Sequence, residues 1–291
     1  MPGSSLVSVV MPSYNHEAYL AVSIASVLAQ SHSELELIII DDGSVDQSRE
    51  IIKRFQADPR VRPLFRDNKG APATLNEGIS LARGEWISII NSDDAFDPLR
   101  LELMIKYLKE SETRWAFSRV DFIDYEGIRL DTPATRWYRD LQNSIAHSRT
   151  VGFALLAANV TLSTGNFFFA KSLVAEIGLF RELDLVHDWD YALRMLRCAE
   201  PVFVEEPLYK YRLHKTNTIR AIPQSTTDRE VNFVLRDFLL NVCATPPRNP
   251  RAPSPHNWPD FDEVIARLDF QGKPYGLYMP SMIENQYLSN G

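Results

Sequence analysis

The chain has 291 residues, 45% hydrophobic and 24% charged, a composition usual for a globular protein with a sizeable core. Its formal net charge of −7 argues against a nucleic-acid duplex as the main ligand, because phosphate backbones are bound by basic surfaces. No apolar run reaches the roughly 18 residues of a membrane span, and the N-terminus does not resemble a secretory signal. We therefore expect a cytoplasmic chain, either free or held by a partner at the inner face of the membrane.

Strands and helices alternate along the first 120 residues. Short β-branched runs predict strands at 6–14, 35–41, 61–65 and 86–91, and amphipathic segments predict helices at 17–30, 46–56, 72–82 and 97–111. Asp46 and Asp97 are placed to cap the second and fourth of these helices. Alternation of apolar strands with helices is typical of an α/β fold with a mostly parallel central sheet flanked by helices.

The second half of the chain is less regular. The pattern predicts a strand and hairpin at 116–130, a strand running into a helix at 164–173, a helix at 187–199, and two short strands broken at Pro207. A strongly amphipathic helix follows at 228–244, then a proline-rich connector at 245–259, expected to be extended, and a short helix within 261–270. We predict a main domain at 1–220 and a C-terminal appendage at 221–291. Packing on the core is the default for its long helix, with dimerisation and membrane docking left open.

Two apolar runs end in paired carboxylates, Asp41-Asp42 in "IIIDDGS" and Asp93-Asp94 in "ISIINSDD". Ligands of parallel α/β sheets bind beyond the carboxyl ends of the strands, so these pairs and the segment "PSYN" after the first strand can form one site. Four neighbouring acids repel one another unless a cation offsets them, which points to Mg²⁺ or Mn²⁺. The alternative is that each aspartate caps a helix or closes a turn. The glycine-rich phosphate loops of nucleotide-binding folds are absent from the sequence.

Six segments occur in the order found in a known family, and together they cover roughly residues 5 to 217. They are "VSVVMPSYNHEAYLAVSIASVLAQS", "ELIIIDDGSVDQS", "NKGAPATLNEGISLARGEWISIINSDD", "STGNFFFAKSLVAEIGLF", "HDWDYALRM" and "EEPLYKYRLHKTNT". In these segments the chain resembles the inverting family-2 glycosyltransferases. The resemblance implies the GT-A fold of nucleotide-diphospho-sugar transferases. It also implies metal-dependent transfer of a sugar, from a UDP-linked donor to a hydroxyl acceptor, in glycan or cell-surface polysaccharide synthesis.

The same resemblance implies a role for individual residues on the donor side. The nucleotide would contact Pro12, Ser13, Tyr14, Asp42, Asn68 and Asp93. Within this set Asp42 would accept the uracil N3–H, which suits an ionised carboxylate, and Asp93 would bind the ribose. Asp94 and His214 would hold Mn²⁺ or Mg²⁺ at the diphosphate, where the ion stabilises the leaving group. A satisfied structural histidine is the alternative for His214.

On the acceptor side the resemblance makes Asp188, in "HDWD", the catalytic base, with Asp190 as the second choice. A plain helix cap is the competing interpretation of Asp188. Gly165, Asn166, His187 and Trp189 would border the donor and acceptor sugars, with Trp189 stacking on a sugar face unless it is buried.

Three departures from the family pattern affect this reading. Thr74-Leu75-Asn76 stands where many relatives have Ala-Arg-Asn, and Arg66 or Lys69 could replace the lost arginine. His187 occupies the position where the family commonly has Glu, and Asn91 occupies a position often held by Asp. Two other functions are alternatives. A nucleotidyltransferase is disfavoured because "PSYNHEAYL" has no glycine-rich basic loop. A catalytically silent sugar-nucleotide-binding module of a larger glycan-assembly protein is the remaining alternative.

Overall fold

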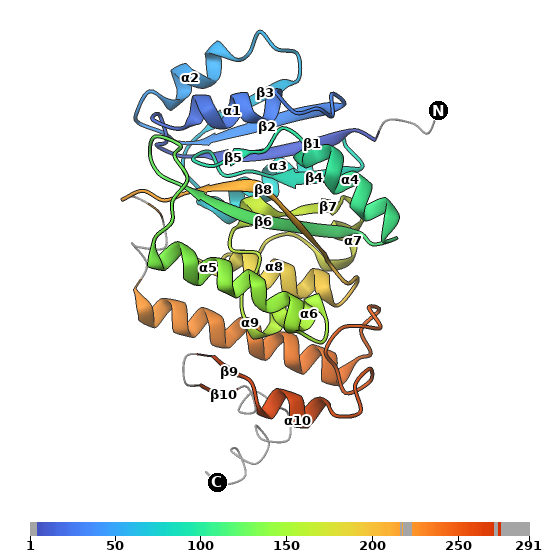
Figure 1. The fold of residues 1–291 in the computed structure, drawn as a ribbon. Helices are drawn as coiled ribbons and strands as arrows, with labels where there is room; N and C mark the ends of the chain where they lie inside the picture. The colour runs from blue at the N-terminus through green and yellow to red at the C-terminus, as the bar shows by residue number, and fades with distance from the viewer. Residues whose placement is uncertain (1–4, 216, 218–222, 271–272, 275–291) are drawn as a thin grey trace.

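The computed structural model describes residues 5–215, 217, 223–270 and 273–274. Its centre is an eight-stranded sheet with the strand order β3-β2-β1-β4-β7-β6-β8-β5 (Figure 1). The strands are β1 (Val7–Ser13), β2 (Leu35–Asp42), β3 (Val61–Arg66), β4 (Trp86–Ile89), β5 (Ala95–Phe96), β6 (Trp115–Ile123), β7 (Phe168–Ala170) and β8 (Val202–Arg212). A two-stranded sheet pairs β9 (Asp269–Phe270) with β10 (Lys273–Pro274).

Most strands of the large sheet run in one direction. β1, β2, β3 and β4 are mutually parallel neighbours. β7 is antiparallel to both β4 and β6, and β8 is parallel to β6, so β6 and β8 share the direction of β1–β4. β5 is antiparallel to β8. The predicted α/β class with a mostly parallel sheet is confirmed. The carboxyl ends of β1, β2, β3, β4 and β8 consequently lie at the same edge.

Each face of the sheet is covered by its own helices, because alternate strand residues point to opposite faces. Val7, Val9 and Met11 join a cluster with α1 (Leu20–Leu28), α2 (Ser48–Arg54) and α4 (Arg100–Glu110). Val10 joins the cluster on the other face. That cluster holds side chains of α3 (Ala71–Leu81), α6 (Val151–Ala157), α7 (Ser172–Ile177), α8 (His187–Leu196), α9 (Gln224–Ala244) and α10 (Phe261–Ala266).

The C-terminal segment packs against the main core. α9 runs beneath α5 (Pro133–Asn143), α6 and α8 in Figure 1, and its apolar stripe, which includes Val231, Leu235 and Phe238, is buried in the same cluster as α8. The default expectation for this helix, packing on the core, is therefore confirmed. The predicted boundary near residue 220 falls outside the described residues.

The proline-rich connector is not extended, contrary to expectation. It folds back in turns against the end of α8, where the Asn249 side-chain amide donates to the Leu196 carbonyl at 2.9 Å and to Glu200 at 2.9 Å. Ala252 and Trp258 are buried beyond it. These fixed partners outweigh the local preference of proline for an extended chain.

Two further expectations differ from the structure. β8 continues through Pro207, because a register shift in its pairing with β6, between Ser118 and Val120, accommodates the proline. Helices α5 and α6 were not predicted, although α5 opens with a capping box of Thr132 and Thr135 and α6 with a Thr150 cap. Within the described part of the chain, no helix is both long and apolar enough to cross a membrane.

Candidate active site

Asp42, the residue expected at the pyrimidine, lies at the end of β2 and holds the loop between β3 and α3. Its carboxylate accepts from the backbone N–H groups of Lys69 and Gly70, both at 2.9 Å, and pairs with Arg66 at 2.8 Å. Asn68, exposed, lies in the same loop. Gly43 is needed beside it, because a Cβ there would meet the Asn68 backbone nitrogen at 2.7 Å and φ is +83°. Asp42 thus ties the end of β2 to the loop that carries Asn68, and a base at Asp42 would share a carboxylate that already accepts from this loop.

The other expected nucleotide contacts lie at the end of β1. Pro12 is partly buried and Tyr14 is exposed beyond the strand. Ser13 is buried, and its hydroxyl finds no hydrogen-bond partner among the described residues. Its Cα pairs with that of Asp41, so the ends of β1 and β2 are level.

Arg66, one of the two proposed substitutes for the missing arginine, lies beside the altered motif. Its guanidinium donates to the Thr74 hydroxyl at 2.7 Å while pairing with Asp42 and, at 2.9 Å, with Glu77. A cation is therefore present between the β2 end and α3, where relatives carry their arginine by resemblance.

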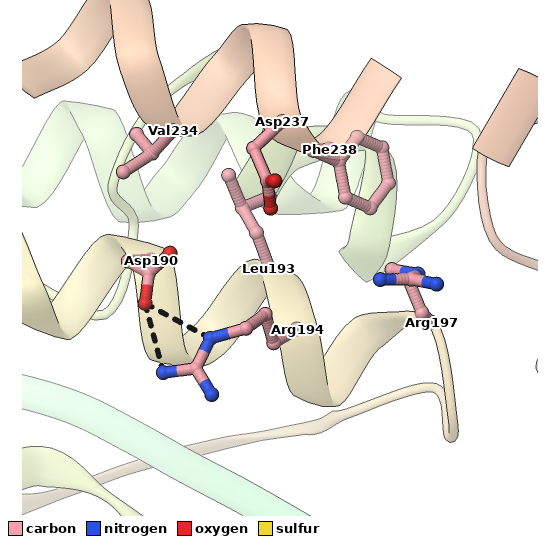
Figure 2. Close-up of a pocket in the computed structure, with 7 residues that line it drawn as sticks. All are labelled: Asp190, Leu193, Arg194, Arg197, Val234, Asp237 and Phe238. Atoms are coloured by element: carbon pink, nitrogen blue, oxygen red, sulfur yellow. Dashed lines mark hydrogen bonds and ion pairs between the residues drawn. The ribbon is translucent and has the colours of Figure 1, made fainter. Parts of the chain in front are cut away.

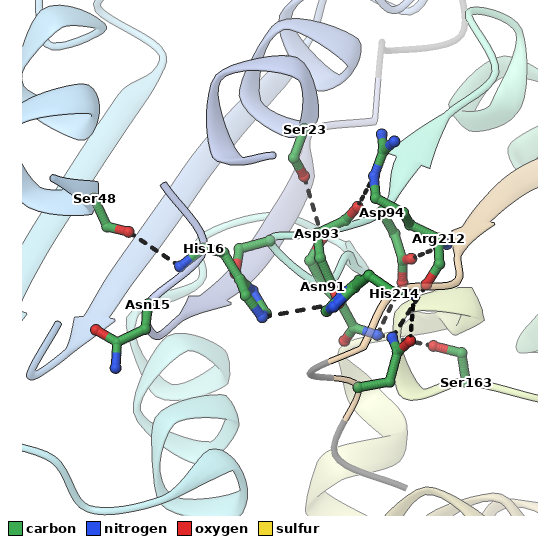
Figure 3. Close-up of polar contacts among 12 residues, drawn as sticks. Asn15, His16, Ser23, Ser48, Asn91, Asp93, Asp94, Ser163, Arg212 and His214 are labelled. Carbon is green, nitrogen blue, oxygen red and sulfur yellow. Dashed lines mark hydrogen bonds and ion pairs between the residues drawn. The ribbon is translucent and has the colours of Figure 1, made fainter. Parts of the chain in front are cut away.

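Three potential metal ligands converge beyond β1, β4 and β8. Among the described residues, His16, Asp93 and His214 are the group whose ligand atoms all lie within 4.8 Å of one another. His214 Nε2 is 2.9 Å and His16 Nε2 is 3.9 Å from the Asp93 Oδ2 (Figure 3). His16 Nδ1 is fixed by the Ser92 hydroxyl at 2.8 Å, which leaves Nε2 facing the group. Such orientation of an imidazole through its second nitrogen is usual at metal sites.

Asp94, the expected ligand, is instead used within the protein. It is 1% exposed. One oxygen accepts from the Arg212 backbone N–H at 2.7 Å, and the other accepts from the Tyr209 hydroxyl at 2.5 Å and the Asn91 amide at 3.0 Å. With three donors on its carboxylate, Asp94 joins the end of β4 to β8. The placement therefore favours Asp93 over Asp94 as the metal ligand and differs from the expected division of roles.

The pKa values of the two neighbouring carboxylates are shifted in opposite directions. Burial alone would raise the pKa of Asp93, but the hydrogen bond with His214 and the charges of His16 and His214 lower it below its ordinary value. Burial, together with the charge of Asp93, raises the pKa of Asp94 well above its ordinary value despite its three donors. The pair therefore holds one readily ionised carboxylate, and that carboxylate is the one facing the histidines.

Asp188, the expected base, lies in the first turn of α8. Its Oδ2 accepts from the Asn159 side-chain amide at 3.0 Å, and its Oδ1 accepts from the Trp189 backbone N–H at 2.7 Å. Burial raises its pKa above the ordinary value, although His187, Asn159 and Trp189 oppose the shift. A raised pKa suits a carboxylate that must accept a proton.

Asp190, the second choice, points away from this position because two residues along a helix correspond to about 200° of rotation. It is buried in ion pairs with Arg194 at 2.8 Å and Arg181 at 3.1 Å. It also borders a shallow depression between α8 and α9 (Figure 2), lined by Asp190, Leu193, Arg194, Arg197, Val234, Asp237 and Phe238. Asp190 is thus a structural ion-pair residue.

Two expected sugar contacts are corrected by their burial. Trp189 is 2% exposed and donates its indole N–H to the Leu155 carbonyl at 2.8 Å, so it packs in the core and cannot stack on a sugar. Asn166 is fully buried, with its amide N–H groups donated to the carbonyls of Ser118 and Thr161 at 2.8 and 3.0 Å. Both side chains are structural.

Gly165 and His187 lie closer to the expected chemistry. A Cβ on Gly165 would meet the Tyr209 hydroxyl at 1.9 Å and the Asn91 nitrogen at 2.9 Å, so glycine permits the close approach of this loop to the Asp94 network. His187 contacts the Thr164 hydroxyl through Nε2 at 3.2 Å, and its Nδ1 is buried without a hydrogen-bond partner among the described residues.

The metal-ligand group and Asp188 are linked through this loop. Asn91 donates to the Ser163 hydroxyl at 3.0 Å, and Thr164, the next residue, contacts His187 beside Asp188. After burial, the charges of Asp94, Asp93 and Asp188 all contribute to raising the pKa of Tyr211 well above its ordinary value. Tyr211 is therefore within electrostatic range of both carboxylate sites.

Sequence reasoning missed His16, Asn159 and Tyr209. His16 directly follows the "PSYN" segment, so a histidine in a strand-end loop beside an acidic pair was an available signal. Asn159 and Tyr209 reach their carboxylates across 29 and 115 residues, and nothing local in the sequence marks them.

Comparison with known proteins identifies relatives over most of the chain. The model of the family described as Glycosyl transferase family 2 matches residues 8–177. An uncharacterized glycosyltransferase of Nostoc sp. is 34% identical over 258 residues, which are 81% of this chain and 76% of that protein. An uncharacterized glycosyltransferase of Haemophilus influenzae is 33% identical over 202 residues, 68% of this chain and 73% of that protein. The Bacillus subtilis protein TuaG, whose name assigns it to teichuronic acid biosynthesis, is 33% identical over 153 residues, 50% of this chain and 61% of its own length.

Two solved structures share the fold at low identity. S. aureus TarS 1-349 in complex with UDP-GlcNAc has a TM-score of 0.66 at 15% identity and covers 97% of this chain and 72% of its own. The mannosyltransferase PcManGT of Pyrobaculum calidifontis, in complex with GDP-Man and Mn²⁺, has a TM-score of 0.61 at 14% identity, covering 98% and 76%. The fold is GT-A, and the chain is a glycosyltransferase that belongs to glycosyl transferase family 2.

Proposed function

We propose that this glycosyltransferase moves a sugar from a UDP-linked donor to a hydroxyl acceptor, with inversion at the anomeric carbon and with a divalent ion bound at the diphosphate. The observation that carries the proposal is the convergence of His16, Asp93 and His214 at one edge of the sheet. The strands β1 and β2 also end at this edge. Ligands of parallel α/β sheets bind at this edge. Asp42 and the Arg66 guanidinium beside it supply an acceptor and a cation suited to a uracil nucleotide.

The donor set fits Mn²⁺ better than Mg²⁺. Two imidazole nitrogens and one carboxylate oxygen suit a transition-metal ion, whereas Mg²⁺ prefers oxygen ligands alone. His16, Asp93 and His214 would hold the ion, and Asp94 would hold the end of β8 that carries His214. A bound ion supplies charge neutralisation to the departing nucleoside diphosphate. The Mn²⁺ complex of PcManGT accords with this assignment.

Asp188 would remove the proton of the acceptor hydroxyl. The acceptor oxygen then forms a bond to the anomeric carbon as the bond from that carbon to the diphosphate oxygen breaks, and the nucleotide leaves with the electron pair. The single displacement inverts the anomeric configuration. Burial favours the neutral form of Asp188, which makes its carboxylate a stronger base than an exposed aspartate.

The acceptor would belong to a cell-surface polysaccharide, and the reaction would take place in the cytoplasm. The similarity to TuaG supports the acceptor class. The UDP-GlcNAc complex of TarS supports a UDP-sugar donor, while the GDP-Man complex of PcManGT makes GDP-mannose the competing donor.

A thermal-shift screen of UDP, GDP and their sugars, with and without Mn²⁺, tests donor and metal together. We expect stabilisation by UDP compounds that requires Mn²⁺, because a ligand stabilises only the state that binds it. Asp188→Asn should keep this shift and lose transfer. Equal shifts without Mn²⁺, or full turnover by Asp188→Asn, would contradict the proposal.

A further inference from the structure

The helix that carries Asp188 begins without a cap of its own. α8 starts at His187, and the residue at its N-cap position, Val186, has no side-chain acceptor. Helix starts leave backbone N–H groups that need partners from elsewhere. The segment 184–186 before α8 is irregular, so its N–H groups also need acceptors.

Glu230 of α9 supplies these acceptors. Its Oε1 accepts from the Asp184 N–H at 2.7 Å, and its Oε2 accepts from the N–H groups of Leu185 and Val186 at 3.0 and 3.2 Å. Glu230 is 5% exposed. No salt bridge joins it to a lysine or arginine within the described ranges, so its partners there are these three N–H groups. Bonds from N–H groups to an ionised carboxylate are among the stronger hydrogen bonds in proteins.

We propose that Glu230 is a positioning residue for the transfer reaction and holds the segment 184–186 so that Asp188 stays aligned with the acceptor. The inference rests on the proposed function, in which Asp188 is the base. Asp188 lies two residues beyond the last N–H that Glu230 binds, and a shift of about 1 Å at a catalytic group costs on the order of 100-fold in rate. α9 lies beyond residues 8–177 matched by the family model, so this contact with the segment before Asp188 comes from the C-terminal part of the chain.

A purely structural role for Glu230, anchoring α9, has a matched control on the same helix. Asp237 is two turns further along the same face and pairs with Arg181 at 3.1 Å. Its hydrogen bonds go to Arg181 and Asn241, and none reaches residues 184–186. Asp237→Asn therefore weakens the attachment of α9 at Arg181 and leaves the N–H groups of 184–186 with their Glu230 acceptor.

The experiment compares wild type, Glu230→Gln, Asp237→Asn and Asp188→Asn. Amide hydrogen exchange of residues 184–190 is measured in the ligand-free proteins. Release of UDP or GDP from UDP-GlcNAc, UDP-glucose and GDP-mannose is measured with Mn²⁺ and water as the acceptor, and Mn²⁺-UDP binding is measured by calorimetry. Glutamine keeps the shape of Glu230 but turns an NH₂ group toward backbone N–H donors.

For Glu230→Gln we expect exchange at 184–190 to accelerate about 10-fold or more and the rate of nucleotide release to fall about 10- to 100-fold, with Mn²⁺-UDP binding within about 3-fold of wild type. Asp237→Asn should leave exchange and rate near wild type. Unchanged exchange in Glu230→Gln, or the same changes in Asp237→Asn, would overturn the inference. Full activity in Asp188→Asn would instead remove the proposed base, an outcome separate from the exchange result.

Discussion

At the scale of single residues, Asp93 and Asp94 show how adjacent, chemically identical side chains take different roles. Asp93 faces His16 and His214, whereas Asp94 accepts from Tyr209, Asn91 and the Arg212 backbone. Both residues lie in the turn between β4 and β5, which directs the two side chains to different partners. Family resemblance alone assigned Asp93 to the ribose and Asp94 to the metal.

Alanine substitutions separate the two roles. Asp93→Ala should weaken Mn²⁺-dependent UDP binding about 10-fold or more with little change in stability, because a ligand is lost. Asp94→Ala should lower the free energy of unfolding by about 2–4 kcal/mol, because it leaves three buried donors without an acceptor. Calorimetry measures the Mn²⁺-dependent binding of UDP, and urea unfolding measures the free energy of unfolding. A larger loss of Mn²⁺ binding in Asp94→Ala than in Asp93→Ala would reverse the assignment.

The pH dependence of turnover should report Asp188 and its partner Asn159. Burial raises the pKa of Asp188 above its ordinary value, so activity should fall as the pH drops through that raised pKa and the base becomes protonated. Asn159→Ala removes a donor to the carboxylate at 3.0 Å, which favours the neutral form further and should move the acidic limb to higher pH. The profile of nucleotide release against pH measures the shift. An unmoved limb, with activity reduced equally at every pH, would mean that Asn159 does not act on the titration of the base.

At the scale of elements, the site depends on a tight crossing between the 3₁₀ turn η2 (Thr164–Asn166) and β8. Arg100 supports it from α4, donating to the Asn166 carbonyl and the Ser118 hydroxyl, both at 2.8 Å, and lying over the Tyr209 ring. Burial lowers the pKa of Arg100 to about 9, still above neutral pH, so a cation lies against the Tyr209 ring.

Gly165→Ala should disrupt this crossing. Its Cβ would meet the Tyr209 hydroxyl and the Asn91 backbone, and the backbone cannot move aside as a flexible side chain can. We expect a loss of about 3 kcal/mol or more in unfolding free energy together with weaker Mn²⁺ binding, because Tyr209 and Asn91 fix Asp94. Gly178→Ala is the control, since alanine there would be strained by the φ of +78° but its Cβ would meet open space. Loss of stability in both variants with Mn²⁺ binding intact would show that the crossing does not shape the metal site.

At the scale of the whole molecule, the sequence predicted the regular half of the fold better than the site. Strands β1 to β4 and their helices follow from the local spacing of apolar residues, with a period of two in strands and 3.6 in helices. Packing of these elements then reinforces the local preference. Trp189 could not be placed from its pattern, because a residue in the first turn of a helix can face the core or the ligand. The carboxylates of Asp188 and Asp94 accept hydrogen bonds from Asn159 and Tyr209, which lie far away in the sequence. These contacts therefore depend on the tertiary fold.

The most direct test of the account is a crystal structure with UDP and Mn²⁺, with the ion located by its anomalous signal. We predict an Mn²⁺ peak bound by His16, Asp93 and His214 and touching the diphosphate, with Asp94 still bonded to Tyr209 and the Arg212 backbone. A peak elsewhere, or a diphosphate bound without an ion at these three side chains, would contradict it.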